Sequence, residues 1–308
     1  MEQSSSEDRT LHLVGVGVTH SIAPEMHNYI AKSLGLPWTF YATECPALDD
    51  LLTLAKKSTT AGLVVTMPYK NSIMKHLDEI DDLATIIGAC NNVYYEDDGH
   101  KRLCGTNTDW RGVQGCLLEK GEEKNRPSAE RPASALIVGA GGASRAAVYA
   151  LANHLHCPTI YILNRDAQEV ESLINDSRRL PAIPHIIYVK TVKEAETLPT
   201  PYYIVGTVPD FEPISESELA VASILEHFLS RSEKGVLLDM CFKPRRTRMI
   251  RLAEQLNWPC VEGTHVIGYQ IKEQWRLWAG EERLQKLDRE GAWNVLLKAA
   301  EDSKGINF

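Results

Sequence analysis

A glycine-rich turn that joins an apolar strand to a helix constrains this chain most. Apolar residues 135–138 predict a buried strand, Gly139–Ala146 (GAGGASRA) follows directly, and apolar positions recur at helical spacing over 143–154. This order suits a dinucleotide-binding turn, because glycines let the backbone approach a pyrophosphate and the helix start offers free N–H groups. Ser144 stands where a third glycine is usual, so a turn without a ligand stays the alternative. A further strand is expected at 159–163, and this order of strand, turn, helix and strand favours the interpretation as a nucleotide-binding turn.

The strand after this turn ends in three polar residues, Asn164, Arg165 and Asp166. Groups at this place face the adenosine ribose in a dinucleotide-binding domain. Arg165 can pair with a 2′-phosphate, whereas Asp166 repels one and can accept a hydrogen bond from a 2′-hydroxyl. Asn164 and Asp166 are also residue types that cap a following helix, and the two roles can coexist.

Short apolar strands alternate with helices along most of the chain, which predicts an α/β protein with mostly parallel sheets. Strands are expected at 11–17, 38–43, 62–66, 91–95, 101–104, 135–138, 159–163, 186–190, 202–206 and 235–240. Helices are expected at 24–35, 48–55, 143–154 and 166–176, with two short helices over 70–87 and a helical end from Val266. The expected core of that end is Trp275, Trp278, Leu284, Leu287, Trp293 and Leu297.

The segment 119–133 interrupts the alternation. It is charged, contains two prolines and lacks a hydrophobic period, so we expect an exposed loop at or near a domain boundary. A chain of 308 residues also fits two domains.

Charge and cysteine usage exclude several classes of protein. The formal net charge of −8 argues against a broad nucleic-acid-binding face, and no apolar run reaches the ~20 residues of a membrane span. The polar, acidic start MEQSSSEDRT resembles neither a signal peptide nor a transit peptide, so a cytoplasmic location is expected. The seven cysteines form no CxxC pair, which predicts buried free thiols and no metal site.

Eight short motifs follow one another along the chain. They are His20–Asn28 (HSIAPEMHN), Val65–Lys70 (VTMPYK), Gly88–Asn92 (GACNN), Gly105–Asp109 (GTNTD), Gly139–Ala146 (GAGGASRA), Asn164-Arg165, Asp239–Pro244 (DMCFKP) and Gly263–Gln270. Each is weak alone, but their joint order over nearly the whole chain resembles the shikimate/quinate dehydrogenase family.

The resemblance implies a two-domain architecture. Residues 1–112 and 265–308 would form an α/β substrate-binding domain, and 113–264 a Rossmann-type domain for NAD(P), with the active site in the cleft between them. The implied reaction transfers a hydride between a ring hydroxyl of a cyclitol carboxylate and the nicotinamide. Such a protein takes a small-molecule substrate and needs neither nucleic acid nor membrane, and its oligomeric state is not predicted.

The resemblance also assigns residues to roles. The catalytic pair would be Lys70 and Asp109, because a lysine beside a carboxylate can hydrogen-bond a hydroxyl and pass on its proton. Substrate-contacting positions would be Ser21, Thr66, Asn91 and Gln270. Cofactor-binding positions would be Gly139, Gly141, Gly142, Ala143, Asn164, Arg165, Asp166, Thr207 and Gly263. Asn107 is expected to shape a turn, and His27 is expected in the core.

Departures from the family pattern bear on the substrate and the cofactor. Ala23 and Phe242 replace a serine and a tyrosine whose hydroxyls lie near the substrate carboxylate in the family, Val64 replaces an asparagine, and the segment from Gly206 to Pro209 is altered. Because Lys70 and Asp109 are both present, we expect an altered substrate, quinate, as in the quinate-oxidising fungal members.

Asp166 stands where the family's NADP pattern has threonine, so NAD is expected rather than NADP. Two alternatives remain open: a shikimate dehydrogenase of aromatic biosynthesis, and a non-catalytic regulatory protein that responds to quinate.

Overall fold

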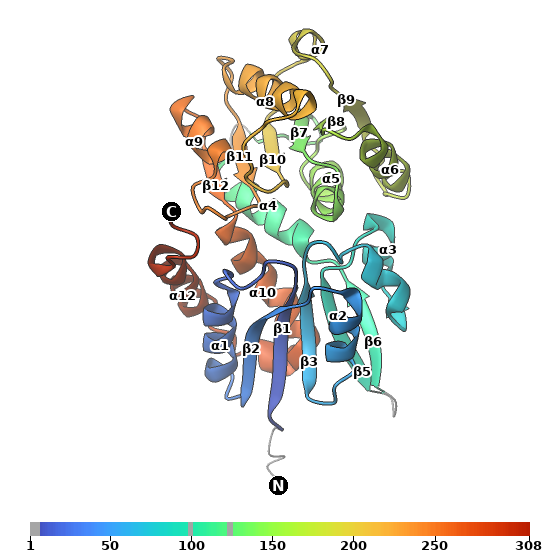
Figure 1. Cartoon of the computed structure of the whole chain (residues 1–308), viewed down its shortest axis with the longest axis vertical. Coiled ribbons are helices and arrows are strands. Elements are labelled where there is room, and N and C mark those ends of the chain that lie inside the picture. The colour runs from blue at the N-terminus through green and yellow to red at the C-terminus, as the bar shows by residue number, and fades with distance from the viewer. Residues whose placement is uncertain (1–6, 98–100, 122–125) are drawn as a thin grey trace. The chain divides into compact units, whose positions relative to one another are not determined.

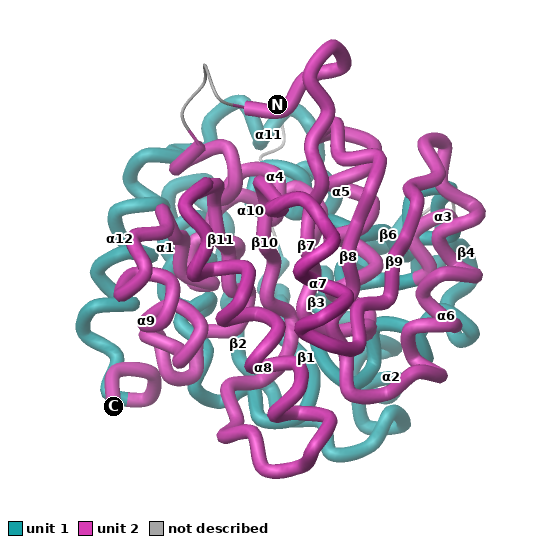
Figure 2. Tube along the Cα trace, turned by 90° about the horizontal axis from the view of Figure 1, so that it is seen from above, with its two compact units in different colours: residues 1–85, 89–108, 270–304 teal, residues 86–88, 109–269, 305–308 magenta. Residues whose placement is uncertain are grey.

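The computed structural model describes residues 7–97, 101–121 and 126–308, which form two compact units (Figure 2). Unit 1 holds the described residues up to Thr85 together with Ala89–Thr108 and Gln270–Lys304. Unit 2 holds Ile86–Gly88, Asp109–Tyr269 and Gly305–Phe308. The domain ends expected at 112 and 264 lie four residues after the division at 108/109 and five residues before the division at 269/270.

Unit 1 is built on a six-stranded sheet with the strand order β2-β1-β3-β5-β6-β4 (Figure 1). The strands are β1 (Arg9–Gly15), β2 (Trp38–Glu44), β3 (Thr60–Val65), β4 (Glu79–Ile80), β5 (Asn92–Asp97) and β6 (Lys101–Thr106). All pairings are parallel except those of β5, which runs antiparallel to β3 and β6. The mostly parallel sheet and the β5–β6 hairpin are therefore confirmed, while residues 98–100 of its expected turn lie outside the described residues.

Helices lie on both faces of this sheet. They are α1 (Ala23–Ser33), α2 (Leu48–Ala55), the 3₁₀ helix η1 (Ser72–His76), α3 (Asp82–Ile87), α10 (Thr264–Ala279), α11 (Glu281–Leu284) and α12 (Arg289–Asp302), of which α3 and α10 cross a unit boundary. On one face, Leu51 and Ala55 of α2 pack in a buried cluster with Leu63 of β3. This cluster is part of the core of unit 1.

Helix α10 covers the opposite face of the unit 1 sheet. The indole of Trp278 lies directly over Gly62 of β3, where an added Cβ would come within 2.2 Å of the indole Nε1. That nitrogen donates a hydrogen bond to the carbonyl oxygen of Val93 (3.1 Å) on β5. Glycine at position 62 therefore lets α10 approach the sheet closely, which fixes the position of the polar side chains one and two turns earlier on the helix.

Unit 2 is built on a six-stranded sheet in which all described pairings are parallel, in the order β12-β11-β10-β7-β8-β9. The strands are β7 (Ser134–Val138), β8 (Thr159–Leu163), β9 (His185–Tyr188), β10 (Tyr203–Gly206), β11 (Val236–Asp239) and β12 (Cys260–Glu262). The chain order reverses between β7 and β10. This is the strand order of the doubly wound dinucleotide-binding fold, whose ligands bind beyond the carboxyl ends of the strands at that reversal.

Among the described residues of unit 2, one helix precedes these strands in the chain, and five connect them. These helices are α4 (Asp109–Lys120), α5 (Gly142–His154), α6 (Ala167–Ser177), α7 (Val192–Glu196), α8 (Glu216–Leu229) and α9 (Arg248–Gln255). Phe228 of α8 and Ile250 of α9 belong to one buried cluster with Leu136 of β7 and Ile204 of β10. Helices α8 and α9 thus cover one face of the central strands.

The structure corrects several sequence-based expectations. Helices α4, α7, α8 and α9 and strands β4 and β12 were not predicted, and the expected loop at 119–133 starts later because α4 continues to Lys120. Trp293, Leu287 and Leu297 are half-buried rather than core residues. For Trp293 and Leu297 the reason is the register of α12, which packs against α1 and buries a different stripe, Ala292, Leu296 and Ala300, whereas Leu287 lies between α11 and α12.

Two expectations about composition can be compared with the described residues. No helix among them combines the length and the apolar character that crossing a membrane requires. Cys45, Cys104, Cys116 and Cys157 are buried, as predicted, whereas Cys241 and Cys260 are only half-buried, so the prediction of buried thiols is wrong for these two.

His27 occupies an aromatic pocket in the core of unit 1. Its ring stacks on Phe40 with ring centroids 4.2 Å apart, and its Nδ1 accepts a hydrogen bond from the Trp275 indole (3.1 Å). Complete burial lowers the pKa of His27 to about 3. The folded protein therefore holds this imidazole neutral at pH values where the unfolded chain is already protonated.

This difference makes stability depend on pH. Because the folded pKa lies below the unfolded value of 6.5, the unfolded chain gains a proton first, and stability falls as the pH drops from 6.5 toward 3.

We predict that His27→Asn, whose amide oxygen can still accept a hydrogen bond from the Trp275 indole, lowers the stability of the protein at pH 7 but makes that stability less dependent on pH. The loss of unfolding free energy between pH 7 and pH 5 should shrink by about 1–2 kcal/mol, as measured by urea unfolding. His12, with a pKa lowered to about 4 by burial, would contribute a pH dependence of the same sign in the variant. An unchanged slope in the variant would show that His27 does not titrate as described.

Candidate functional site

One edge of the unit 1 sheet gathers the ends of four strands. Because β5 is antiparallel to its neighbours, its start lies beside the ends of β3 and β6. The Thr66 amide donates to the carbonyl oxygen of Val14 on β1 (2.9 Å), and the Cys90 amide donates to the carbonyl oxygen of Lys70 (2.8 Å). Asn91 follows directly and leads into β5. The backbone therefore brings three predicted site residues, Thr66, Lys70 and Asn91, to the same edge.

A network of buried side chains is centred on Asn91. Its Oδ1 accepts from the Thr108 backbone amide (2.6 Å), and its Nδ2 donates to Oε1 of Gln270 on α10 (2.8 Å). The Thr108 hydroxyl donates to the same Gln270 oxygen (2.6 Å). All three residues are buried. Amide and hydroxyl groups held in this way can recognise the hydroxyls of a small polyol, because they offer both donors and acceptors.

Thr108 and Gln274 belong to this network but were not predicted as site residues. Gln274 lies one helical turn beyond Gln270 and places its Nε2 3.5 Å from both the Thr108 hydroxyl and the Gln270 Oε1. Thr108 lies inside the Gly105–Asp109 motif, so the sequence motif could have pointed to it as a site residue. Nothing in the sequence pattern distinguishes Gln274 from a surface glutamine.

Ser21 and Ala23 lie at the start of α1. The Ser21 hydroxyl accepts from the Ala23 amide (3.2 Å), so it helps to begin the helix. Ser21 is half-buried, as are Thr66 and Lys70, whereas Ala23 is buried with an exposed fraction of 5%. A hydroxyl added at residue 23 would therefore enter a confined space.

Asp109 follows Thr108 directly and is the first residue of α4. Asp109 is 4% exposed, and a carboxylate at a helix N-terminus is favoured by the helix dipole. Asn107, two residues earlier, donates from its side chain to the carbonyl oxygen of Ala89 (2.9 Å), which agrees with the expected role in shaping a turn.

The glycine-rich turn of unit 2 links β7 to α5. Gly139 has a φ of +118°, and an added Cβ would lie 2.3 Å from the Thr207 hydroxyl. That hydroxyl donates to the Val138 carbonyl oxygen (2.8 Å), so Ser144 must donate to Thr207 across their 2.8 Å contact. Ser144 in place of a third glycine therefore ties the start of α5 to the end of β10 and does not disrupt the turn.

Gly141 differs from Gly139 in the same turn. A Cβ built there meets no atom within 4 Å, so protein packing does not require a glycine. The space lies at the N-terminus of the 13-residue helix α5, where free N–H groups and the helix dipole favour an anion. The turn therefore fits a pyrophosphate, with Gly141, Gly142 and Ala143 as the residues that would hold it.

Arg145 fixes the shape of the same turn. Its Nη1 donates to the carbonyl oxygens of Ala140 (2.9 Å) and Gly141 (3.2 Å), and its Nε donates to Asp176 on α6 (2.7 Å). These bonds anchor the turn to the neighbouring helix before any ligand arrives.

The three polar residues after β8 have distinct partners. Asp166 caps α6, with Oδ1 accepting from the Gln168 amide (2.7 Å), which confirms the capping role. Asn164 donates to Glu169 on α6 (2.9 Å). Arg165 is largely exposed, and its Nη1 contacts Oε1 of Glu218 on α8 at 2.6 Å.

A cavity of about 390 Å³ lies beyond the carboxyl ends of β7 and β8 within unit 2. Its wall includes the polar residues Asn164, Arg165 and Glu218 together with the apolar residues Val208 and Pro209. An apolar cavity with a few polar groups suits a flat heteroaromatic base with an attached sugar.

Gly263, the remaining predicted cofactor residue, is buried between β12 and α10. A Cβ there would lie 2.4 Å from the carbonyl oxygen of Met240, so close backbone packing already accounts for the glycine.

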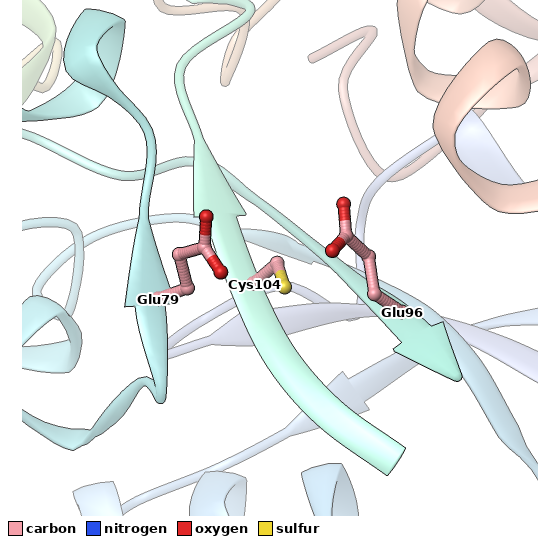
Figure 3. Close-up of side chains that lie close together, drawn as sticks. All are labelled: Glu79, Glu96 and Cys104. Atoms are coloured by element: carbon pink, nitrogen blue, oxygen red, sulfur yellow. The ribbon is translucent and has the colours of Figure 1, made fainter. Parts of the chain in front are cut away.

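Glu79, Glu96 and Cys104, on β4, β5 and β6, bring two carboxylate oxygens and a thiol sulfur within 4.8 Å of one another, as the ligands of a metal ion would be (Figure 3). Arg102 lies between the carboxylates, 2.7 Å from Glu79 and 2.8 Å from Glu96, and supplies the positive charge that an ion would otherwise bring. Burial raises the pKa of the Cys104 thiol, which disfavours the thiolate that metals prefer. The cluster is an ion-pair network on the sheet.

Comparison with known proteins identifies the relatives of this chain. Residues 13–93 match the family model described as the shikimate dehydrogenase substrate binding domain. The chain is 33% identical over 297 residues to a quinate dehydrogenase of Emericella nidulans, covering 90% of each protein.

Solved structures share the whole fold. A shikimate 5-dehydrogenase from Thermus thermophilus, in complex with NADP(H) and shikimate, matches with a TM-score of 0.72 and 25% identity over 94% of this chain and 99% of that one. A quinate dehydrogenase from Corynebacterium glutamicum, in complex with NAD, has a TM-score of 0.72 and 23% identity over 95% of this chain and all of that one, which shows the shared fold. Sequence, fold and the order of the motifs agree, and the chain belongs to the shikimate/quinate dehydrogenase family of NAD(P)-dependent oxidoreductases that act on a CH–OH group.

Proposed function

We propose that this chain is a quinate dehydrogenase that oxidises the C3 hydroxyl of quinate reversibly to 3-dehydroquinate with NAD. The observation that carries the proposal is the buried Asn91–Thr108–Gln270 network at the sheet edge that also holds Lys70. Its amide and hydroxyl groups suit a polyol. The 33% identity to the Emericella nidulans quinate dehydrogenase over 90% of both proteins supports quinate as that polyol.

Each of the two units has its own proposed binding role. Unit 1 would bind the substrate, which the match of residues 13–93 to a substrate binding domain supports. Unit 2 would bind the dinucleotide at the Gly139–Ala143 turn and in the cavity beside Asn164 and Arg165.

The chemistry assigned to the side chains is proton transfer and orientation. Bound NAD would take up the hydride from C3. Lys70 and Asp109 would remove the hydroxyl proton as the hydride leaves, since oxidation of an alcohol must release both. Ser21, Thr66, Asn91 and Gln270 would hold the carboxylate and the other hydroxyls, so that only one ring carbon is presented for oxidation.

A shikimate dehydrogenase of aromatic biosynthesis is the second candidate function, because the Thermus thermophilus relative was solved with shikimate. A non-catalytic protein that responds to quinate is a third, although the presence of both Lys70 and Asp109 argues against it. Absorbance assays of NADH formation with quinate and with shikimate separate the three. A higher kcat/KM for quinate supports the proposal, a higher value for shikimate supports the second candidate, and quinate binding without NADH formation supports the third.

We predict that Lys70→Ala lowers kcat by at least ~10²-fold, the low end for loss of a general acid–base group, with a smaller change in cofactor affinity. Lys75→Ala, which removes an exposed lysine five residues later, is the matched control and should leave kcat unchanged. Near wild-type kcat in Lys70→Ala would refute the catalytic assignment.

Ala23 is predicted to favour quinate over shikimate. Quinate carries an additional C1 hydroxyl, and the buried methyl of Ala23 leaves more room than the serine of the family pattern. Ala23→Ser should therefore lower kcat/KM for quinate relative to shikimate by a factor that corresponds to roughly 1–3 kcal/mol. Ala23→Gly changes volume without adding a hydroxyl and serves as the control. A ratio that is unchanged, or that moves toward quinate, would exclude Ala23 as a selector.

Asp166 is predicted to favour NAD over NADP, because its carboxylate would meet the like charge of a 2′-phosphate. Asp166→Thr should raise kcat/KM for NADP, since threonine keeps a helix cap and adds a hydrogen-bond donor. Both cofactors should be compared at one ionic strength, because charge effects are screened by salt. A wild-type preference for NADP would contradict the proposed cofactor.

A further inference from the structure

Arg165 and Glu218 form an ion pair in the wall of the unit 2 cavity. Arg165 Nη1 lies 2.6 Å from Glu218 Oε1, and both residues line the cavity. The two residues are 53 positions apart in the chain. Arg165 is the cation that the sequence motif offers to a 2′-phosphate, so an ion-pair partner for it bears on which dinucleotide binds.

The carboxylate of Glu218 is held in place by its own helix. Glu218 is the third residue of α8 and forms a capping box with Ser215. Its Oε2 accepts from the backbone amides of Ser215 (3.0 Å) and Ile214 (3.2 Å), which leaves Oε1 directed at Arg165. These backbone hydrogen bonds, together with Arg165, lower the pKa of Glu218 to about 2, so it is charged at neutral pH.

Arg165, by contrast, is 67% exposed and carries a long flexible side chain. Its position is therefore set by the fixed carboxylate and not by the packing of its own stem. Arg165, Asp166 and Glu218 carry one positive and two negative charges, so these three side chains have a net charge of −1. A 2′-phosphate would have to displace Glu218 from Arg165 and would then lie beside two carboxylates.

We propose that Glu218 is a positioning residue that excludes NADP by holding Arg165 away from a 2′-phosphate. This inference rests on the proposed use of NAD and names a residue that enforces it. Glu218 acts through Arg165 and adds its own repulsion, because a discriminating site gains selectivity from unfavourable contacts with the wrong ligand.

The direct test measures binding of adenosine fragments to the full chain by isothermal titration calorimetry, without catalysis. The probes are 5′-ADP and 2′,5′-ADP, which differ in the position of one phosphate. Glu218→Gln keeps a side chain that can complete the capping box but removes the charge. We expect 2′,5′-ADP to bind about three- to tenfold more tightly to Glu218→Gln than to the wild type, with little change for 5′-ADP.

Two further variants separate positioning from a general effect of charge. Glu194→Gln removes a carboxylate from the equivalent position of α7, where Glu194 accepts from the Lys190 amide and Thr191 caps the helix. Glu194 does not line the cavity, so both dissociation constants should stay unchanged. In Arg165→Ala/Glu218→Gln, the gain for 2′,5′-ADP should be mostly lost, because the freed cation is absent.

The outcomes distinguish this inference from the cofactor proposal. If the wild type binds 2′,5′-ADP better than 5′-ADP, the proposed NAD preference fails, whatever Glu218→Gln does. If the wild type prefers 5′-ADP but Glu218→Gln leaves the ratio unchanged, the preference stands and the role of Glu218 is refuted. A gain that persists in the double variant would likewise refute action through Arg165.

Discussion

The side chain of Asn91 joins three parts of unit 1 that are distant in the sequence. One amide group binds the segment before α4 through Thr108 and helix α10 through Gln270, while its own residue directly precedes β5. Because the amide is buried, a hydrogen bond lost there and not replaced by another group would cost about 1–3 kcal/mol. The same bonds that hold the sheet edge together therefore orient the polar groups proposed to bind the cyclitol.

In unit 2, too, one side chain joins several elements, at the glycine-rich turn. Thr207 accepts from Ser144 and donates to Val138, which joins β7, α5 and the end of β10 at one hydroxyl. Arg145 ties the turn to α6. The turn is thus ordered by the protein, and Gly141 has no packing reason to be a glycine. A preorganised anion site of this kind loses little conformational entropy when a pyrophosphate binds.

Much of this arrangement could be predicted from the sequence, and the exceptions have physical causes. The alternation of apolar strands and helices predicted the two sheets, and the glycine turn predicted the strand-turn-helix at 135–154. Helix α8 was missed although Ser215 and Glu218 have the capping-box pattern that marks the start of a helix. Gln274 and Glu218 were missed because their roles depend on contacts with Thr108 and Arg165, which only the folded chain brings together. Trp293 was assigned to the core by its type, whereas the register of α12 decides which face is buried.

The proposed function depends on binding of a cyclitol carboxylate at the sheet edge of unit 1 that holds Asn91. A crystal structure of the chain with quinate would show whether it binds there. We expect quinate hydroxyls within hydrogen-bond distance of Lys70 Nζ and of the Asn91 and Gln270 amides. Quinate bound at any other place on the chain, with these three side chains touching no ligand atom, would contradict it.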